Sequence, residues 1–246
     1  MLRQRVITAL IMAALFLGAV IFLPLPALAV VFGLIIGGGA WEWSRLAGWE
    51  SPVPRGLYAL VAMAVLAAIY IYCPLGEDPP RERVQPILGL ACLWWSFALL
   101  WIRAYPGSAL LWRNVPMRSL MGLLILAPAW TAAMYLLSYP RGGLLLVVMV
   151  VVVVAADVAA YFSGKAWGKH QLAPVVSPKK TWEGFWGGIG SCVLLSVILW
   201  QLLPDPVAHI GLGAVMAVTV TTALASVVGD LTVSMVKRES GVKDSG

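Results

Sequence analysis

The chain has 246 residues, of which 61% are hydrophobic and only 11% are charged, and its mean hydropathy is +0.90. So few polar side chains cannot cover the surface of a water-soluble domain of this length. The composition excludes an ordinary soluble protein and indicates a polytopic membrane protein. The three cysteines, Cys73, Cys92 and Cys192, show no CxxC spacing, so neither a disulfide framework nor a zinc site is supported.

Apolar runs long enough to cross a bilayer predict eight transmembrane helices, each bounded by proline, glycine or charge. The predicted spans are residues 6–23, 27–43, 57–73, 86–102, 119–138, 143–162, 183–203 and 207–229. The valines at 150–154 favour a strand, but a lone lipid-exposed strand cannot satisfy its backbone in a bilayer. The expected fold class is therefore all-α, with residues 1–246 forming a single integral-membrane domain.

Arginine and lysine placement predicts the orientation of the chain. With the N-terminus in the cytoplasm, fourteen of the seventeen basic residues lie in inside segments, and the outside keeps Arg81, Arg83 and Arg141. The net charge of +6 is then explained mainly by the positive-inside orientation, and attraction to anionic lipid is a weaker second explanation. The first span is interpreted as an uncleaved helix, although Arg3, Arg5 and the Ala27-Leu28-Ala29 sequence also resemble a cleavable secretory signal.

A charged cluster interrupts the apolar pattern between Asp157 and Gly188, where four lysines, a histidine, an aspartate and a glutamate gather. A carboxylate near lipid costs about 2.5 kcal/mol or more, so intramembrane ionisable groups are candidates for function. Asp157, Tyr161 and Lys165 recur every four residues and share one face of the sixth predicted span. They either bind substrate or metal in a hydrated pocket, or neutralise one another.

Ser177-Pro178 is typical of a helix N-cap followed by proline at the first helical position. This pattern predicts that the seventh span starts here, with Lys179, Lys180, Thr181 and Glu183 in its opening turns. Free backbone N–H groups at such an end, with two ammonium groups and a hydroxyl beside them, would bind a phosphate. The alternative is a lysine pair that only fixes topology. Gly184 and Gly188 form GxxxG, which predicts close packing against another helix.

A second charged cluster closes the chain from Gly229 to Gly246. Asp230, Ser234 and Lys237 share one face as the last span leaves the membrane. One carboxylate with nearby cations suits Mg²⁺, which commonly takes one or two carboxylates together with substrate phosphates. A solvated helix end is the alternative interpretation.

These motifs resemble those of the phosphatidate cytidylyltransferase (CDP-diacylglycerol synthase) family. The resemblance is carried by residues 234–238 (SMVKR) with 243–246 (KDSG), by 157–161 (DVAAY), by 164–169 and by 177–184 (SPKKTWEG). It implies Mg²⁺-dependent transfer of the cytidylyl group of CTP to phosphatidic acid, which gives CDP-diacylglycerol and pyrophosphate. It also implies an enzyme of the bacterial-type inner membrane with a cytoplasmic active site.

The resemblance assigns roles residue by residue. Catalytic candidates are Asp230, Lys237, Arg238, Lys243 and Asp244; substrate-binding candidates are Asp157, Tyr161, Lys165, Ser177, Lys179, Lys180, Thr181, Glu183 and Ser234; metal candidates are Asp230 and Asp157. In the family the pattern continues through a His-Gly-Gly element and an Asp-Arg-x-Asp element into a final helix. The expectation is therefore a C-terminally truncated form, inactive or nearly so, without a carboxylate that would share the metal with Asp230.

Two other functions stay open at this point. A CTP-dependent transferase or kinase acting on another membrane lipid would need similar residues. A transporter would use Asp157 and Glu183 as coupling carboxylates, but the charges gather at one face and no inverted repeat is present. Membrane lipids are expected partners, nucleic acid is not, and association into a homodimer stays open.

We predict from the charge distribution that positions 113, 169 and 237 face the cytoplasm and that position 83 faces outward. Single cysteines at these positions, in a background without Cys73, Cys92 and Cys192, test this. A membrane-impermeant thiol reagent added to intact cells should label only the cysteine that replaces Arg83. External labelling of the cysteine that replaces Lys169 would contradict the orientation.

Overall fold

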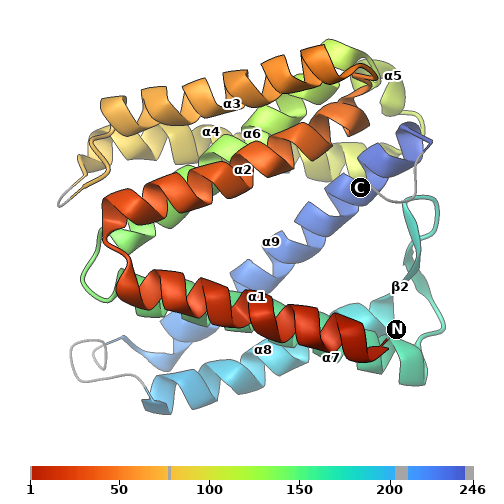
Figure 1. Ribbon diagram of the computed structural model, residues 1–246. Coiled ribbons are helices and arrows are strands. Elements are labelled where there is room, and N and C mark those ends of the chain that lie inside the picture. Colours follow the sequence, from red (N-terminus) through yellow and green to blue (C-terminus); the bar gives the residue numbers. More distant parts are fainter. Residues whose placement is uncertain (1, 77–78, 203–209, 242–246) are drawn as a thin grey trace. The chain divides into compact units, whose positions relative to one another are not determined.

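The computed structural model describes residues 2–76, 79–202 and 210–241 (Figure 1). Its helices are α1 (Leu2–Phe22), α2 (Leu25–Ala47), α3 (Pro52–Tyr72), α4 (Arg81–Ala104), the short α5 (Ala109–Trp112), α6 (Val115–Leu137), α7 (Gly142–Trp167), α8 (Trp182–Leu202) and α9 (Leu212–Glu239). Two short strands, β1 (Gln171–Ala173) and β2 (Ser177–Thr181), join α7 to α8.

The fold is that of a polytopic membrane protein and is all-α, as the sequence predicted, apart from the short hairpin of β1 and β2. Within the described residues, seven helices are long and apolar enough to cross a membrane, and the apolar stretch of α1, Ile7–Phe22, is shorter. Each of the eight predicted runs overlaps a helix, but only seven of these helices are long and apolar enough to count as spans, so the predicted count of eight is approximate. The last boundaries were wrong: α9 begins at Leu212, and it continues past Gly229 to Glu239.

Local sequence signals set several helix ends. The Asn114 side chain accepts a hydrogen bond of 2.8 Å from the Met117 N–H and so caps the start of α6. Gly48 ends α2 with a φ of 104°, a left-handed conformation that glycine adopts without steric penalty. These ends do not depend on distant packing, which explains why the sequence indicates them well.

The chain divides by its internal contacts into two compact units. Unit 1 comprises Met1–Trp94 and Asn114–Val147, and unit 2 comprises Trp95–Arg113 and Val148–Asp244. In unit 1, the buried Trp130 of α6 packs in a cluster with Ala29 of α2 and Leu66 of α3. The charged clusters found in the sequence fall mainly in unit 2.

Glycines allow α7 and α8 of unit 2 to approach closely. A Cβ atom added to Gly184 would lie 2.8 Å from the Ala160 carbonyl oxygen, and one added to Gly188 would lie 3.0 Å from that of Ala156. The Ser163 hydroxyl, buried between the helices, donates to the Ala159 carbonyl at 2.7 Å. The prediction that GxxxG packs against another helix is confirmed, and its partner is the half of α7 that carries Asp157.

We expect Gly184→Ala to destabilise the protein, because its methyl group would overlap backbone atoms that cannot move aside. Overpacking of this kind typically costs about 1–3 kcal/mol. Gly190→Ala on the same helix is the matched control, since nothing lies within 4 Å of its added Cβ. Thermal unfolding in detergent should show a lower midpoint for the first variant only. Equal midpoints would contradict the packing argument.

Candidate functional site

The lysine motif lies on a β-hairpin, not in a helix. Strands β1 and β2 pair antiparallel, with Gln171 opposite Thr181 and Ala173 opposite Ser177. The prediction that Ser177 caps a helix was therefore wrong. The cap is Thr181, whose hydroxyl accepts a hydrogen bond of 3.2 Å from the Gly184 N–H as α8 begins at Trp182. Serine and proline are compatible with an edge strand as well as a helix start, and here the hairpin prevails.

This placement changes the predicted anion site. The Trp182 N–H donates to the His170 carbonyl at 2.9 Å, and the Gly184 N–H is taken by Thr181. Two of the amides that the start of α8 could offer to a phosphate are thus already paired. Successive strand residues point to opposite faces, so Lys179 and Lys180 do not share a direction. An anion here depends on side chains more than on the helix backbone.

Lys180 brings the two predicted metal carboxylates into one neighbourhood. Its ammonium forms an ion pair with the Asp230 carboxylate of α9. Asp157 of α7 interacts electrostatically with both Lys180 and Asp230. Charged side chains of three elements, α7, β2 and α9, therefore lie near one another within unit 2. We name these three residues the acid–lysine cluster. The lysine side chain is 28% exposed and the Asp230 side chain 60% exposed, so solvent and ligands can reach the cluster.

The donor set of this cluster suits a magnesium ion that also binds phosphates. Within the described residues, no group of three or more histidine, cysteine, aspartate or glutamate side chains could hold a metal by itself. Mg²⁺ does not require such a group, because it commonly takes one or two carboxylates and completes its octahedron with water and substrate phosphates. Asp157 and Asp230 fit that mode of binding, and they do not fit a closed structural metal site.

The end of α9 is tied to the hairpin and to the segment after α4. Arg238 donates from Nε to the Val176 carbonyl at 3.2 Å. The Tyr105 hydroxyl donates to the Glu239 carboxylate at 3.4 Å. Burial first and the Glu239 carboxylate second raise the pKa of the Tyr105 phenol. Arg238 therefore holds the hairpin turn through its Nε–H group.

Glu183 anchors the open end of the hairpin. Its carboxylate lies 2.7 Å from the ring nitrogen Nδ1 of His170 and accepts from the His170 backbone N–H at 3.3 Å. With the Trp182 bond to the His170 carbonyl, this makes His170 the point where the hairpin is fastened to α8. From the sequence, Glu183 is expected to bind substrate, and His170 has no assigned role. Glutamate thirteen residues after histidine carries no recognisable signal.

The remaining candidates lie around the cluster. Tyr161 is exposed and packs edge-on against Phe162, and Lys165 and Lys179 are exposed. Ser234 and Lys237 are half-buried on α9, on the helix face that their spacing from Asp230 predicts. Lys243 and Asp244 lie outside the described residues. Tyr105, Val176 and Glu239 are additions that sequence reasoning missed, because single tyrosine and valine residues have no motif.

A membrane-embedded bundle with carboxylates and lysines at helix ends defines an integral membrane protein with a candidate site for phosphate ligands. Comparison with known proteins identifies the family. The model of the cytidylyltransferase family matches residues 3–246. The chain therefore belongs to the cytidylyltransferase family.

Individual relatives carry names that agree with this family assignment. The phosphatidate cytidylyltransferase of Pseudomonas aeruginosa is 39% identical over 245 residues, which cover 100% of this chain and 87% of that protein. The protein of the same name from Haemophilus influenzae is 36% identical over 100% of this chain and 89% of its own length. A Staphylococcus epidermidis relative of that name is 43% identical over 37% of this chain and 34% of its own length.

We expect Glu183→Gln to loosen the hairpin without unfolding the protein. The glutamine keeps the shape of the side chain but loses the negative charge that strengthens its bonds to His170, and solvent around the exposed His170 keeps the effect on overall stability small. Hydrogen exchange followed by mass spectrometry should be faster in residues 170–182 than in the parent. Lys179→Gln, an exposed change on the same hairpin, should leave exchange there unaltered. Unchanged exchange in both variants would contradict the anchoring role.

Proposed function

We propose that this chain transfers the cytidylyl group of CTP to phosphatidic acid, producing CDP-diacylglycerol and pyrophosphate, at the acid–lysine cluster. Family membership supports the reaction, because relatives that match along the whole chain carry the name phosphatidate cytidylyltransferase. The observation that carries the site is the convergence of Asp157, Lys180 and Asp230 from three separate elements.

The proposed reaction does not require a proton to be removed from the attacking phosphate. A phosphomonoester has a second pKa of about 6, so phosphatidate is largely dianionic near neutrality and needs no general base. One of its phosphate oxygens attacks the α-phosphorus of CTP. The bond from that phosphorus to the bridging oxygen of the β-phosphate breaks, and pyrophosphate leaves. Catalysis then consists of holding two anions in line and stabilising negative charge.

The residues in and around the cluster would bind different parts of the two substrates. Asp230 and Asp157 would hold Mg²⁺, which supplies positive charge to the triphosphate and to the departing pyrophosphate. Lys180 pairs with Asp230, and its ammonium would contact phosphate oxygens when substrate binds. Lys179, on the opposite face of β2, and Lys237 and Arg238, at the end of α9, supply further positive charge near the membrane surface.

The cluster also suits a reaction at the membrane surface. Phosphatidate carries its acyl chains in the bilayer and its phosphate at the interface, so an enzyme that uses it needs charged groups at the ends of apolar helices. Asp230 lies on α9 six residues before the sequence VKRE that ends this helix, and Lys180 lies two residues before the start of α8. We propose that this site faces the cytoplasm, where CTP is found, in agreement with the predicted orientation.

The direct test is incubation of the purified protein with CTP, Mg²⁺ and phosphatidate, followed by mass spectrometry of the lipid product. CDP-diacylglycerol and an equal amount of pyrophosphate are expected when the family's C-terminal elements are present, and little or none from residues 1–246 alone. A phosphorylated lipid with release of CDP would identify a CTP-dependent kinase instead. Replacing phosphatidate by diacylglycerol or by another phospholipid distinguishes a transferase with a different acceptor.

We predict that Asp230→Asn abolishes turnover while the fold survives, because asparagine keeps the shape of a largely exposed side chain but removes its charge. Lys180→Ala should lower the rate by about ten- to a hundredfold, as expected for a charge-assisted contact of roughly 1.5–3 kcal/mol. Arg113→Ala, an exposed change in the same unit, is the control. Thermal unfolding of each variant separates loss of activity from loss of structure.

The double variant Lys180→Ala with Asp230→Asn tests what the lysine does. If Lys180 only neutralises Asp230, its removal should cost nothing further once Asp230 is asparagine, and the double variant should match Asp230→Asn both in residual turnover and in CTP binding. If Lys180 also contacts substrate phosphates, the double variant should bind CTP more weakly than Asp230→Asn. Normal Mg²⁺-dependent activity of Asp230→Asn would contradict the metal assignment.

A further inference from the structure

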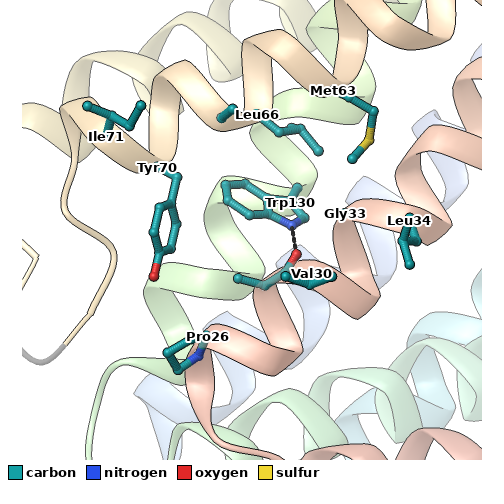
Figure 2. A pocket seen from close by; sticks show the side chains of 11 residues that line it. Pro26, Val30, Gly33, Leu34, Met63, Leu66, Tyr70, Ile71 and Trp130 are labelled. Carbon is teal, nitrogen blue, oxygen red and sulfur yellow. Dashed lines mark hydrogen bonds between the residues drawn. The ribbon is translucent and has the colours of Figure 1, made fainter.

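An apolar groove lies between α2 and α3 in unit 1, with Trp130 of α6 at its base. Its volume is about 460 Å³, within the usual range of ligand pockets. Figure 2 shows Pro26 and Tyr70 toward one end and Leu34 and Met63 toward the other, with Trp130 between them. None of these residues takes part in the proposed reaction, so the groove has no role in it.

The shape of the groove suits a chain. Pro26 and Leu34 mark its length along α2, and a helix rise of about 1.5 Å per residue makes that length roughly 12 Å. On the α3 side the lining runs from Ile71 back to Met63, as expected for consecutive antiparallel helices. A groove two helical turns long fits an extended aliphatic chain better than a compact polar molecule.

The lining offers nothing to a charged or strongly polar ligand. It contains no aspartate, glutamate, lysine, arginine or histidine. The indole N–H of Trp130 donates to the Ala29 carbonyl at 3.2 Å, so that polar group is already satisfied. Cavities of this character stay free of water and accept apolar molecules.

The surroundings of the groove identify what fills it. Helices α2, α3 and α6 are all long and apolar enough to span a membrane. Val30, Leu34 and Ile71, which form its rim, are 62%, 65% and 79% exposed in the isolated chain. Side chains that expose this much apolar surface on a membrane span face hydrocarbon. The medium at the opening of the groove is therefore lipid acyl chains.

We propose that this groove binds one acyl chain of a membrane phospholipid and does so without recognising the headgroup. Its occupant is a structural lipid and not the phosphatidate that is consumed, since no cation in the lining could hold a phosphomonoester. The predicted orientation supports this, because it places the start of α2 and the end of α3 at the external surface. Tyr70 stands at that end, where an amphipathic ring suits the membrane interface.

Photolabelling in vesicles tests the proposal. The protein is reconstituted into phosphatidylethanolamine and phosphatidylglycerol containing a trace of phosphatidylethanolamine with a mid-chain diazirine. After irradiation, the expected labelled residues include Met63, Leu66 and Trp130, identified by peptide mass spectrometry. The same diazirine chain on phosphatidylglycerol or phosphatidate should give the same pattern, because the headgroup is not read.

Two glycines of α2 provide a blocking variant and its control. A Cβ added to Gly33 meets Met63, Trp130 and Leu66 only at 3.7–4.0 Å, so Gly33→Leu can extend into the groove. Nothing lies within 4 Å of a Cβ added to Gly38, which is exposed and outside the lining, so Gly38→Leu is the matched control. Gly33→Ala adds a single methyl group and serves if the larger residue disturbs folding.

Loss of label from Trp130 in Gly33→Leu, with label retained in Gly38→Leu, is the expected result. Equal labelling of Trp130 in both variants would overturn the proposal. Much stronger labelling by the phosphatidate probe would show a substrate site and contradict headgroup independence. A change from dimer to monomer in Gly33→Leu, measured by crosslinking in the same vesicles without any change in lipid label, would show that a second copy covers the groove. CDP-diacylglycerol synthesis is measured separately, so this test does not depend on the proposed reaction.

Discussion

Charge placed at the boundary of a hydrocarbon layer must be paired or hydrated, and this constraint shapes the functional half of the protein. Asp157 lies on α7, a helix otherwise rich in valine, where an isolated carboxylate would be unfavourable by about 2.5 kcal/mol or more. The hairpin between α7 and α8 brings Lys180 to this carboxylate and to Asp230. The strands and the glycine contacts are therefore parts of one arrangement that supplies compensating charge.

Close approach of α7 and α8 makes that arrangement possible. The hairpin starts and ends within one short connection, so the distance between the two helices decides where Lys180 can reach. Gly184 brings the backbone of α8 close to the Ala160 carbonyl, and Thr181 caps α8 beside Gly164. Replacing Gly184 would move the hairpin as well as the helix. Packing of small residues in the bilayer thus positions a polar site at its surface.

The sequence predicts the helices well because each apolar run is long and a bilayer admits few alternatives. It identifies Asp157, Lys180 and Asp230 from local spacing and family motifs, but not their convergence, since the Lys180–Asp230 contact joins residues fifty positions apart. The hairpin was missed because Ser-Pro before charged residues is a strong helix-start signal. The role of His170 and the contact between Tyr105 and Glu239 depend on tertiary structure alone.

The exposure of the Lys180–Asp230 pair bears on why it exists. A solvent-accessible ion pair contributes only about 0–1 kcal/mol to folding, and with Asp230 60% exposed this pair belongs near that range. Stability is thus a weak reason to pair Lys180 with Asp230. A charge cluster that adds little stability but remains open to solvent is suited to exchanging partners. When phosphate oxygens and a cation enter, the carboxylates and the ammonium can each find a new counter-charge without rebuilding the fold.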